Sequence, residues 1–505
     1  MGLLRPRAAL ALAAGVALCA APSALGRSAV LGHSGRWLTD ASGRVVVLHG
    51  VAVMNFDPPH LPAAQGFSKD DAAFLAAHGF NIVRVGFNWS HLEPRPGAVN
   101  PRYLASLRRS VRILARRGIW SVLDLHQDGY GPAVHGDGAP GWATLTDGLP
   151  NPDLGFGANY LGNTAVNRAF DNLWSDARGP GGMGLQARYA EMLASLAHAF
   201  RRERGVLGYE LFNEPWPGSP YATCANPDGC PAFDAQLSAF YRRTIAGVRR
   251  SDPRHVVFYE PNLFFDFGAA THLANASGGD PRTGFAFHDY CLGGGAGTAL
   301  PNIPGNGPGC EVEETMVMQN AEAYAARERV PLLNTEWAAT NDLSNVARMA
   351  GELDAARIPW TYWQYCCSSD GYTLLIDGKK PPAGRNVERG VLRIIDRPFP
   401  QRVAGTPTSW SWDPGRRRFR LTYTTKAAGR ALRSRAVTRV WVGRLHFRSG
   451  YTRKATGARI LSRAGARVIV LRNRRGAATV TLTVRPRTAY ATTCSSGACE
   501  SGRSR

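Results

Sequence analysis

Between residues 45 and 396, short apolar runs alternate with longer segments in which apolar residues recur every three or four positions. The apolar runs predict eight strands, at 45–53, 81–89, 120–128, 206–213, 255–260, 284–290, 331–337 and 360–365. Several of these runs are continuously apolar, which is typical of parallel strands covered by helices. The longer segments predict helices at 70–78, 102–117, 185–202, 233–250, 312–328 and 343–356. Eight strands separated by helices favour an α/β fold, the (β/α)8 TIM barrel.

A doubly wound open sheet is the alternative fold, although no Gly-x-Gly-x-x-Gly motif follows a predicted strand. Two connections are long and rich in Gly and Pro: residues 129–185 follow the third strand, and residues 291–310 follow the sixth. Loops of this length usually have a function, and in a barrel they would lie over the carboxyl ends of the strands.

The pattern changes after Arg397-Pro398-Phe399-Pro400. Shorter runs with turn residues between them, at 418–424, 438–445, 467–471 and 478–484, predict an antiparallel β-sandwich. We therefore expect a barrel domain over residues 28–397, a sandwich domain over residues 398–490 and a flexible tail over residues 491–505.

Charge divides the chain at the same place. The formal net charge is +22, and residues 401–505 contain 24 Lys and Arg but only two acidic residues, Asp413 and Glu500. The first 400 residues contain 36 basic and 36 acidic residues, so the whole excess lies in the C-terminal part.

The N-terminus has the order of a secretory signal peptide. Arg5 and Arg7 precede an apolar run over residues 8–21, and small residues follow at 23–26. The run is short for a membrane span, so a retained anchor is the weaker alternative. We expect a signal peptide over residues 1–27 and a secreted, extracellular protein.

Cysteine usage fits an exported protein. Of nine cysteines, Cys19 would leave with the signal peptide, and the remaining even number suggests disulfides. Short loops predict the pairs Cys224–Cys230, Cys291–Cys310 and Cys494–Cys499. The adjacent Cys366 and Cys367 leave two alternatives open, a vicinal disulfide or free thiols. A zinc site is not expected because no Cys-x-x-Cys spacing occurs.

Two glutamates end predicted strands on opposite sides of the barrel mouth, where barrel enzymes place catalytic groups. Glu214 follows the fourth strand within Asn213-Glu214-Pro215, and Glu336 ends the seventh strand. Carboxyls about 5–5.5 Å apart cleave glycosidic bonds with retention, one protonating the departing oxygen and the other attacking the anomeric carbon. We expect Arg84, in the second strand, to lower the pKa of Glu336, whose charge would raise the pKa of Glu214.

Each of these residues also has a structural interpretation when taken alone. Arg84 could form a buried ion pair, His126 and His288 could be core histidines, and Trp363 could be core packing. Glu260-Pro261 also ends a strand, but it lacks the preceding Asn and ranks below Glu214. Chance placement of all these residues at strand ends is the less economical explanation.

Together these residues resemble glycoside hydrolase family 5, and within it the endoglycoceramidases. The most specific segments are LDLHQDGY at 123–130, FDNLW at 170–174, GYELFNEPWPG at 208–218 and RPFPQRVAGTP at 397–407. The resemblance extends from about Trp37 into the C-terminal domain. Two departures stand out. Asn55-Phe56-Asp57 occupies a place where some relatives have a basic glycan-binding residue, and Ala338 follows Trp337 where Gly is common.

The resemblance implies roles for ten residues. Glu214 corresponds to the acid/base and Glu336 to the nucleophile, while Asn213 matches the residue that binds the sugar 2-hydroxyl. The others match residues that orient the nucleophile (Arg84, Tyr290), active-site imidazoles (His126, His288), sugar contacts (Asp128, Trp174) and an aromatic platform (Trp363). No metal or cofactor is implied.

The first functional hypothesis is an endo-acting, retaining glycosidase that releases glycan from glycosphingolipids. Its apolar groove would come from Trp216, 263–265, Phe267 and the loop containing Trp142, Leu145 and Leu149, or these residues are ordinary loop packing. The alternatives are a cellulase or mannanase acting on polysaccharide and a non-catalytic glycan-binding protein. The basic sandwich could contact anionic lipid or attract acidic glycans, or simply aid solubility. Nucleic acid is not an expected partner because no such motif occurs. The pattern does not indicate an oligomeric state.

Overall fold

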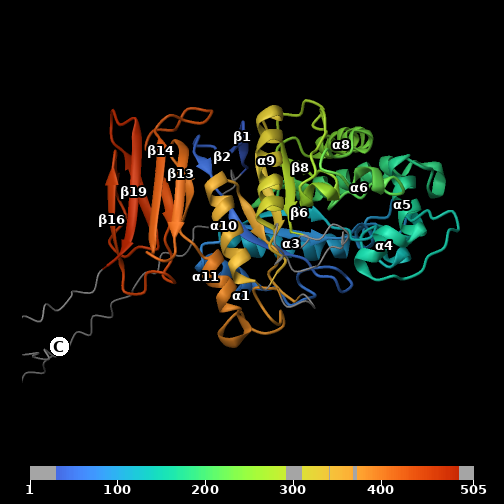
Figure 1. Ribbon diagram of the computed structural model, residues 1–505, viewed down its shortest axis with the longest axis horizontal. Coiled ribbons are helices and arrows are strands. Elements are labelled where there is room, and N and C mark those ends of the chain that lie inside the picture. Colours follow the sequence, from blue (N-terminus) through green and yellow to red (C-terminus); the bar gives the residue numbers. More distant parts are fainter. Residues whose placement is uncertain (1–29, 292–309, 341, 368–371, 488–505) are drawn as a thin grey trace, which may run out of the picture.

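The computed structural model describes residues 30–291, 310–340, 342–367 and 372–487, which form a barrel and a sandwich (Figure 1). The predicted signal peptide, the tail beyond residue 490 and the pair Cys494–Cys499 lie outside these residues. Among the helices within them, none is long and apolar enough to cross a membrane.

Eight parallel strands close into a barrel, which confirms the predicted fold. In chain order they are β4 (His49–Val53), β5 (Ile82–Phe87), β6 (Trp120–Leu125), β7 (Val206–Glu210), β8 (Val256–Tyr259), β9 (Thr283–Asp289), β10 (Leu332–Trp337) and β11 (Trp360–Tyr362). Each overlaps one of the predicted strands. All eight are fully buried, because side chains fill the interior and helices cover the outside.

The six predicted helices are also present: α1 (Lys69–Ala77), α3 (Pro101–Arg116), α6 (Leu185–Phe200), α8 (Pro231–Ser251), α9 (Cys310–Glu328) and α10 (Leu343–Ala356). Local sequence sets where they begin. Ser68 and Asp71 form a capping box at α1, and Asn100 accepts the backbone N–H of Arg102 and of Tyr103 at α3.

The connection after β6 is more ordered than its composition predicted. It contains α4 (Phe156–Gly162) and α5 (Thr164–Trp174), which the sequence analysis treated as loop. Asn163 caps α5, and apolar residues at helical spacing, from Val166 to Phe170 and Leu173, bury one face. The Gly and Asn residues around this short pattern concealed it.

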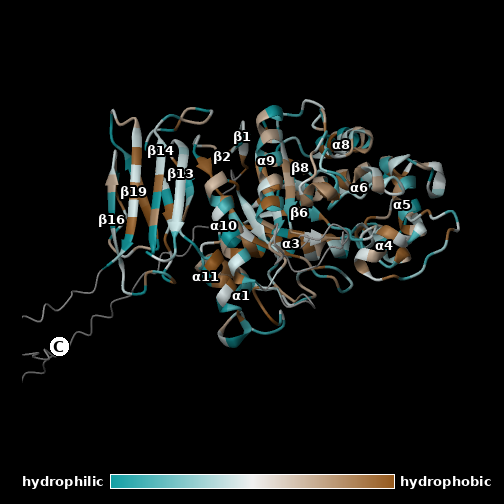
Figure 2. Ribbon diagram, viewed as in Figure 1, coloured by the Kyte–Doolittle hydropathy of each residue, from teal (hydrophilic) through white to brown (hydrophobic). Residues whose placement is uncertain are grey.

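The C-terminal region forms two antiparallel sheets. One contains β1 (Gly32–Ser34), β2 (Trp37–Thr39), β3 (Val45–Val46), β12 (Phe399–Val403), β15 (Thr438–Trp441), β18 (Val468–Asn473) and β17 (Ala458–Ile460), in that order. The other contains β13 (Thr406–Asp413), β14 (Arg418–Thr424), β19 (Thr479–Pro486) and β16 (Tyr451–Thr456). Figure 2 shows hydrophilic and hydrophobic residues interspersed along these strands, as one buried and one exposed face require.

This arrangement corrects two expectations about the start of the chain. Residues 32–46 belong to a sheet of the sandwich, although we assigned them to the barrel domain. The single strand predicted at 45–53 is therefore two strands, β3 in the sandwich and β4 in the barrel. Continuous hydrophobicity could not reveal this break because Val47 and Leu48 are as deeply buried as the strands they join.

The sandwich packs against the amino-terminal end of the barrel. The indole N–H of Trp410 donates to Asp354 at the end of α10, and that of Trp441 donates to Asp396. A side chain at Gly79, in the turn before β5, would overlap the Trp441 ring, and Gly79 also has a positive φ of 83°. Leu31 and Leu38 join the buried apolar cluster that fills this end of the barrel.

Three disulfides lie within the described residues. Cys224–Cys230 and Cys291–Cys310 confirm the predicted local pairs. Cys366 and Cys367 form a vicinal disulfide, which decides between the two alternatives left open by the sequence.

Candidate active site

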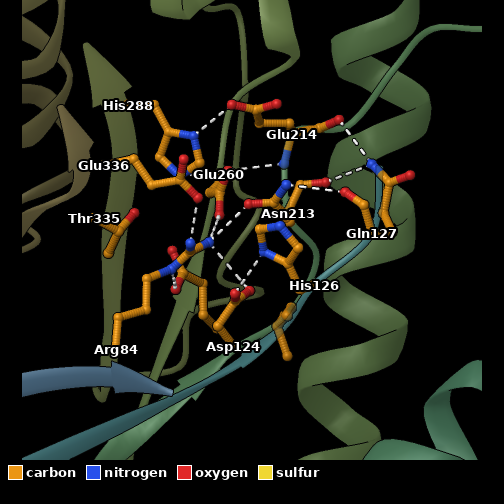
Figure 3. Close-up of polar contacts among 12 residues, drawn as sticks. Arg84, Asp124, His126, Gln127, Asn213, Glu214, Glu260, His288, Thr335 and Glu336 are labelled. Carbon is orange, nitrogen blue, oxygen red and sulfur yellow. Dashed lines mark hydrogen bonds and ion pairs between the residues drawn. The ribbon is translucent and has the colours of Figure 1, made fainter. Parts of the chain in front are cut away.

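Polar side chains from six strands meet at the open end of the barrel (Figure 3). Arg84 projects from β5, Asp124 from β6, His288 from β9 and Glu336 from β10, while Glu214 and Glu260 lie beyond the ends of β7 and β8. Residues of parallel strands that point inward form layers, so widely separated sequence positions become neighbours.

Glu214 and Glu336 contact the same imidazole ring. Nδ1 of His288 lies 2.7 Å from Oε1 of Glu214, and Nε2 lies 3.6 Å from Oε1 of Glu336. The two carboxyls therefore contact opposite nitrogens of one ring at the mouth. The structure thus brings together the two glutamates singled out by their strand-end positions.

Two donors hold Glu336. The Nη1 atom of Arg84 contacts Oε1, and the Tyr290 hydroxyl donates to Oε2 at 2.6 Å. Burial nevertheless raises the pKa of Glu336 above its ordinary value, opposed by His288 and Arg84. Arg84 lowers the pKa of Glu336, as expected, but the net pKa is still raised, because the desolvation of an enclosed carboxyl outweighs one guanidinium shared among several acids.

The pKa of Glu214 is raised strongly, so this carboxyl keeps its proton at neutral pH. Burial, followed by the charge of Asp128, raises the pKa of Glu214 to about 8, with His126 and Arg84 opposing. We expected Glu336 to be the cause, but desolvation and Asp128 are the two largest effects. Glu214 has a φ of 42°, in the left-handed region that few residues other than glycine adopt.

The two active-site histidines differ in charge. Burial would lower the pKa of His126, but Asp124 at 2.8 Å from Nδ1 and Asp128 at 3.3 Å from Nε2 together hold it well above its usual value. Burial lowers the pKa of His288 to about 4, with Glu336 opposing. His126 is therefore a cation at neutral pH, whereas His288 is a neutral ring between the two glutamates.

Asn213 is fixed at both ends of its side chain. Its Oδ1 accepts from Nη2 of Arg84 at 2.8 Å, and its Nδ2 donates to the carbonyl of Gln127 at 3.0 Å. It lies on the cavity wall beside Glu214. The residue implied to bind a sugar hydroxyl is thus held rigidly at the mouth.

A cavity of about 1360 Å³ opens above these residues. Of the ten residues named from the sequence, it is lined by His126, Asp128, Asn213, Glu214, Tyr290, Glu336 and Trp363. Arg84 and His288 lie beneath its floor and contact the glutamates directly.

Trp174 does not join the site. It packs against Phe212, Phe233 and Phe240, its indole N–H donates to the carbonyl of Trp216, and it is absent from the cavity wall. The structure therefore places this implied sugar contact in the core, one layer behind the mouth.

Some active-site neighbours were missed by the sequence analysis. Asp124 and Glu210 face Arg84 from inside the barrel, and Glu260, which we ranked as a strand-end decoy, accepts the backbone N–H of Glu214 at 3.0 Å. The signal was present: Asp124 lies two residues before His126, on the same face of the strand. Phe56, which is 41% exposed, stands edge-on to His126 and Trp363 in the cavity.

Two groups of side chains place possible metal-ligand atoms within 4.8 Å of one another: Glu210, Glu260 and His288, and Glu214, Asp266 and His288. In the first group, Arg84 lies 2.6 Å from Glu210 and 3.6 Å from Glu260, so a cation is already supplied. The second group contains Glu214, whose raised pKa favours a proton there.

The cavity wall has two chemically different sides. Loops after β4 and β11 supply the more polar side, defined here as Asp57, Gln65, Asp377 and Lys379, although Phe56 and Ile376 from the same loops also line it. Loops after β8 and β10 supply the apolar side, defined as Leu263, Phe267, Ala338 and Ala339. The strand order places the loops after β4 and β8 across the mouth from each other, whereas the loops after β10 and β11 are neighbours on paired strands. Of the expected groove residues, Leu263 and Phe267 line the cavity and Leu149 is exposed outside it, whereas Trp142, Leu145, Trp216, Phe264 and Phe265 pack in or against the core.

Known proteins with similar sequences and structures share this architecture. Endoglycoceramidase I of Rhodococcus hoagii is 31% identical over 409 residues, covering 78% of this chain and 77% of that protein. Endo-glycoceramidase II from Rhodococcus sp., solved as a lactosyl-enzyme intermediate, matches with a TM-score of 0.70 and 26% identity over 90% of this chain and all of that one. Its ganglioside GM3 complex matches with a TM-score of 0.69 at 26% identity, covering 90% and 99% of the two chains.

An endogalactoceramidase structure matches equally well, with a TM-score of 0.70 and 25% identity over 91% of this chain and all of that one. A model of the glycoside hydrolase family 5 C-terminal domain matches residues 397–485. The model described as cellulase (glycosyl hydrolase family 5) matches residues 40–369, and the chain therefore belongs to glycoside hydrolase family 5.

Proposed function

We propose that this protein is a retaining, endo-acting glycosidase that releases the intact glycan from glycosphingolipids. The observation that carries the proposal is the pairing of Glu214 and Glu336 across the single ring of His288. Retaining glycosidases need two neighbouring carboxyls, with one protonated and one ionised.

In the first step, Glu336 attacks the anomeric carbon while Glu214 donates its proton to the oxygen of the departing group. The carbon–oxygen bond to that group breaks, and a glycosyl ester of Glu336 forms. Arg84 and Tyr290 hold the carboxylate of Glu336 in place for this attack. The raised pKa of Glu214 keeps its proton available at neutral pH.

In the second step, Glu214 is ionised and takes a proton from water, whose oxygen attacks the same carbon. The ester bond breaks, Glu336 returns to a carboxylate, and Glu214 regains its proton. Two inversions give net retention of configuration.

The two sides of the cavity support an amphipathic substrate. Glu214 lies on the loop after β7, next to the apolar side, so the departing group that it protonates would lie there. Trp363 and Phe56 stand next to the polar side and would receive the sugar ring. Ceramide and a neighbouring hydroxyl-rich glycan match this division, and the similar proteins carry names of ceramide-glycan hydrolases.

The direct test is incubation with defined glycosphingolipids and mass analysis of both products. We expect free oligosaccharide and ceramide in equal amounts, with the β-anomer as the first sugar product by NMR. Release of monosaccharide alone contradicts endo action. Turnover of cellulose or mannan without ceramide release favours a polysaccharide hydrolase, and glycan binding without turnover favours a binding protein.

We also propose that the protein is secreted. The charged and apolar order of residues 5–26 and the disulfides support export. The test is N-terminal sequencing of protein recovered from the culture medium. We expect an N-terminus near residue 28, and retention of the whole chain inside cells contradicts the proposal.

We further propose that the sandwich contacts anionic lipid headgroups through the exposed face of the sheet β13-β14-β19-β16. Arg420 and Lys454 flank Thr483 in register, and Arg418 and Arg485 are exposed on the same face. Sedimentation with vesicles of phosphatidylglycerol should fall when Arg418, Arg420 and Lys454 become Glu, and salt should weaken wild-type binding. Equal binding to neutral vesicles contradicts a charge-based contact.

A further inference from the structure

Two buried glutamates lie beneath the acid/base. Glu210 ends β7 and Glu260 follows β8, and these strands pair directly. Glu210 is fully buried and Glu260 is 1% exposed. Each carboxyl has one oxygen with a donor: Oε2 of Glu210 accepts from Nε of Arg84 at 2.6 Å, and Oε2 of Glu260 accepts the N–H of Glu214 at 3.0 Å.

The remaining oxygen of each carboxyl has no hydrogen-bond donor within the part of the chain that the structure describes. These are Oε1 of Glu210 and Oε1 of Glu260, and the two carboxyls approach within 4.8 Å. Two ionised carboxyls enclosed at this distance repel each other, and unpaired buried acceptors are costly. One proton between them converts two unmatched acceptors into one O–H···O bond.

The carboxyls around Arg84 outnumber the cations beside them, which favours one bound proton. Arg84 faces four carboxyls, those of Asp124, Glu210, Glu260 and Glu336. His126 offsets Asp124, while His288 is neutral and supplies no charge. Burial, followed by the charge of Glu210, raises the pKa of Glu260 well above its ordinary value. Glu336 must stay ionised as nucleophile, so the added proton belongs on the glutamate pair.

We propose that Glu260 shares a proton with Glu210 and acts as a neutral positioning residue for Glu214. Its Oε2 atom accepts the backbone N–H of Glu214 and thereby holds that residue in its left-handed conformation. Because Glu260 is uncharged, it fixes the place of the acid/base without changing its proton affinity. The inference rests on the proposed glycosidase function for its kinetic consequences, but the shared proton itself does not.

The decisive variant is Glu260→Gln, which keeps an acceptor for Glu214 and a donor for Glu210 without changing the charge. On a defined glycosphingolipid, whose departing oxygen needs the proton of Glu214, we expect kcat/KM within about fivefold of wild type and an unmoved basic limb of the pH profile. Glu260→Ala should lower kcat by about tenfold at unchanged KM, because Glu214 loses the hydrogen bond from its backbone N–H to Glu260 and is no longer held in position. If Glu260 is instead ionised, Glu260→Gln removes a negative charge near Glu214 and moves the basic limb to lower pH, which overturns the proposal. Wild-type kcat in Glu260→Ala also overturns it.

Infrared spectroscopy gives a readout that does not depend on activity. The difference spectrum between wild type and Glu260→Gln at pH 7 should show loss of a protonated-carboxyl C=O band. A band unchanged by the substitution contradicts the shared proton. The matched control is Glu93→Gln, which alters a buried glutamate held by Trp89 and Gly97 away from the site and should leave the pH profile unchanged. A wild-type protein inactive on every glycoside contradicts the proposed function, and the infrared result still decides the proton.

Discussion

The polar and apolar sides of the cavity share one catalytic floor but are built from different loops. Asp57 and Lys379 come from the loops after β4 and β11, whereas Phe267 and Ala339 come from those after β8 and β10. The floor of the cavity, defined here as Glu214, Glu336 and the buried groups beneath them, lies between the two sides. Arg84 contacts Glu336 and holds it in place. The difference indicates that chemistry is set by strands common to all substrates, and substrate choice by loops on each side.

The largest effect is expected from substituting the catalytic glutamates, which act on every substrate whichever side of the cavity it contacts. Glu336→Gln should lower kcat on the order of 10⁴-fold on glycolipid and soluble aryl glycoside alike, because no nucleophile remains. Glu214→Gln should lose as much on glycolipid but far less on an aryl glycoside whose leaving group needs no proton. Stopped assays with both substrates measure this, with the exposed Glu191→Gln as control. Equal losses on both substrates in Glu214→Gln would count against its role as acid.

The apolar side is expected to matter for glycolipid alone. Phe267→Asn should lower kcat/KM for a glycosphingolipid by about 10–100-fold, since a buried aromatic contact is worth about 1.5–3 kcal/mol. The same variant should change kcat/KM for a soluble aryl lactoside by less than about threefold, because that substrate has no lipid chain to bind. Ile376→Asn is the matched control, since Ile376 is 58% exposed on the opposite wall. Parallel losses on both substrates would place the lipid elsewhere.

The pH profile tests the floor itself. Glu214 must be protonated to act, and its pKa is raised to about 8, so kcat/KM should fall about tenfold per pH unit above that value. Glu336 must be ionised, and its raised pKa places the acid limb above the ordinary carboxyl range. Asp128→Asn removes a charge that raises the pKa of Glu214, so the basic limb should move to lower pH. A basic limb that stays in place would show that another group controls it.

Sequence pattern predicted the floor better than the walls. The alternation of strands and helices identified all eight barrel strands, and the strand ends brought Glu214 and Glu336 together above Arg84 from the second strand. Each inward position in a parallel barrel converges on one mouth, so the geometry follows from the fold. The prediction that Trp174 contacts the sugar was not met, because a motif match does not distinguish a residue on the cavity wall from one in the layer behind it.

Electrostatic balance was the part that local sequence could not provide. The pKa values of Glu214 and Glu336 depend on enclosure and on Asp128, which only the folded mouth brings together. The assignment of residues 32–46 to the barrel domain was wrong for a related reason. These residues belong to the sandwich because β3 pairs with β12, which lies more than 350 residues away in the sequence. Such contacts leave no periodic signal in either segment.

The polar side is expected to give the smallest and least selective effect. Phe56 is exposed in the cavity and meets Trp363 edge-on, so the two rings form one aromatic surface against which a sugar ring would pack. Phe56→Ala should raise KM by about fivefold, the value of one aromatic contact near 1 kcal/mol, while kcat stays close to wild type. Because both substrates carry the same sugar, glycolipid and aryl lactoside should change together, in contrast to the effect of Phe267→Asn. Leu154→Ala removes a similarly exposed side chain that is absent from the cavity wall and serves as control. A change confined to the glycolipid would mean that Phe56 contacts lipid, and the division of the cavity into a sugar side and a lipid side would then be wrong.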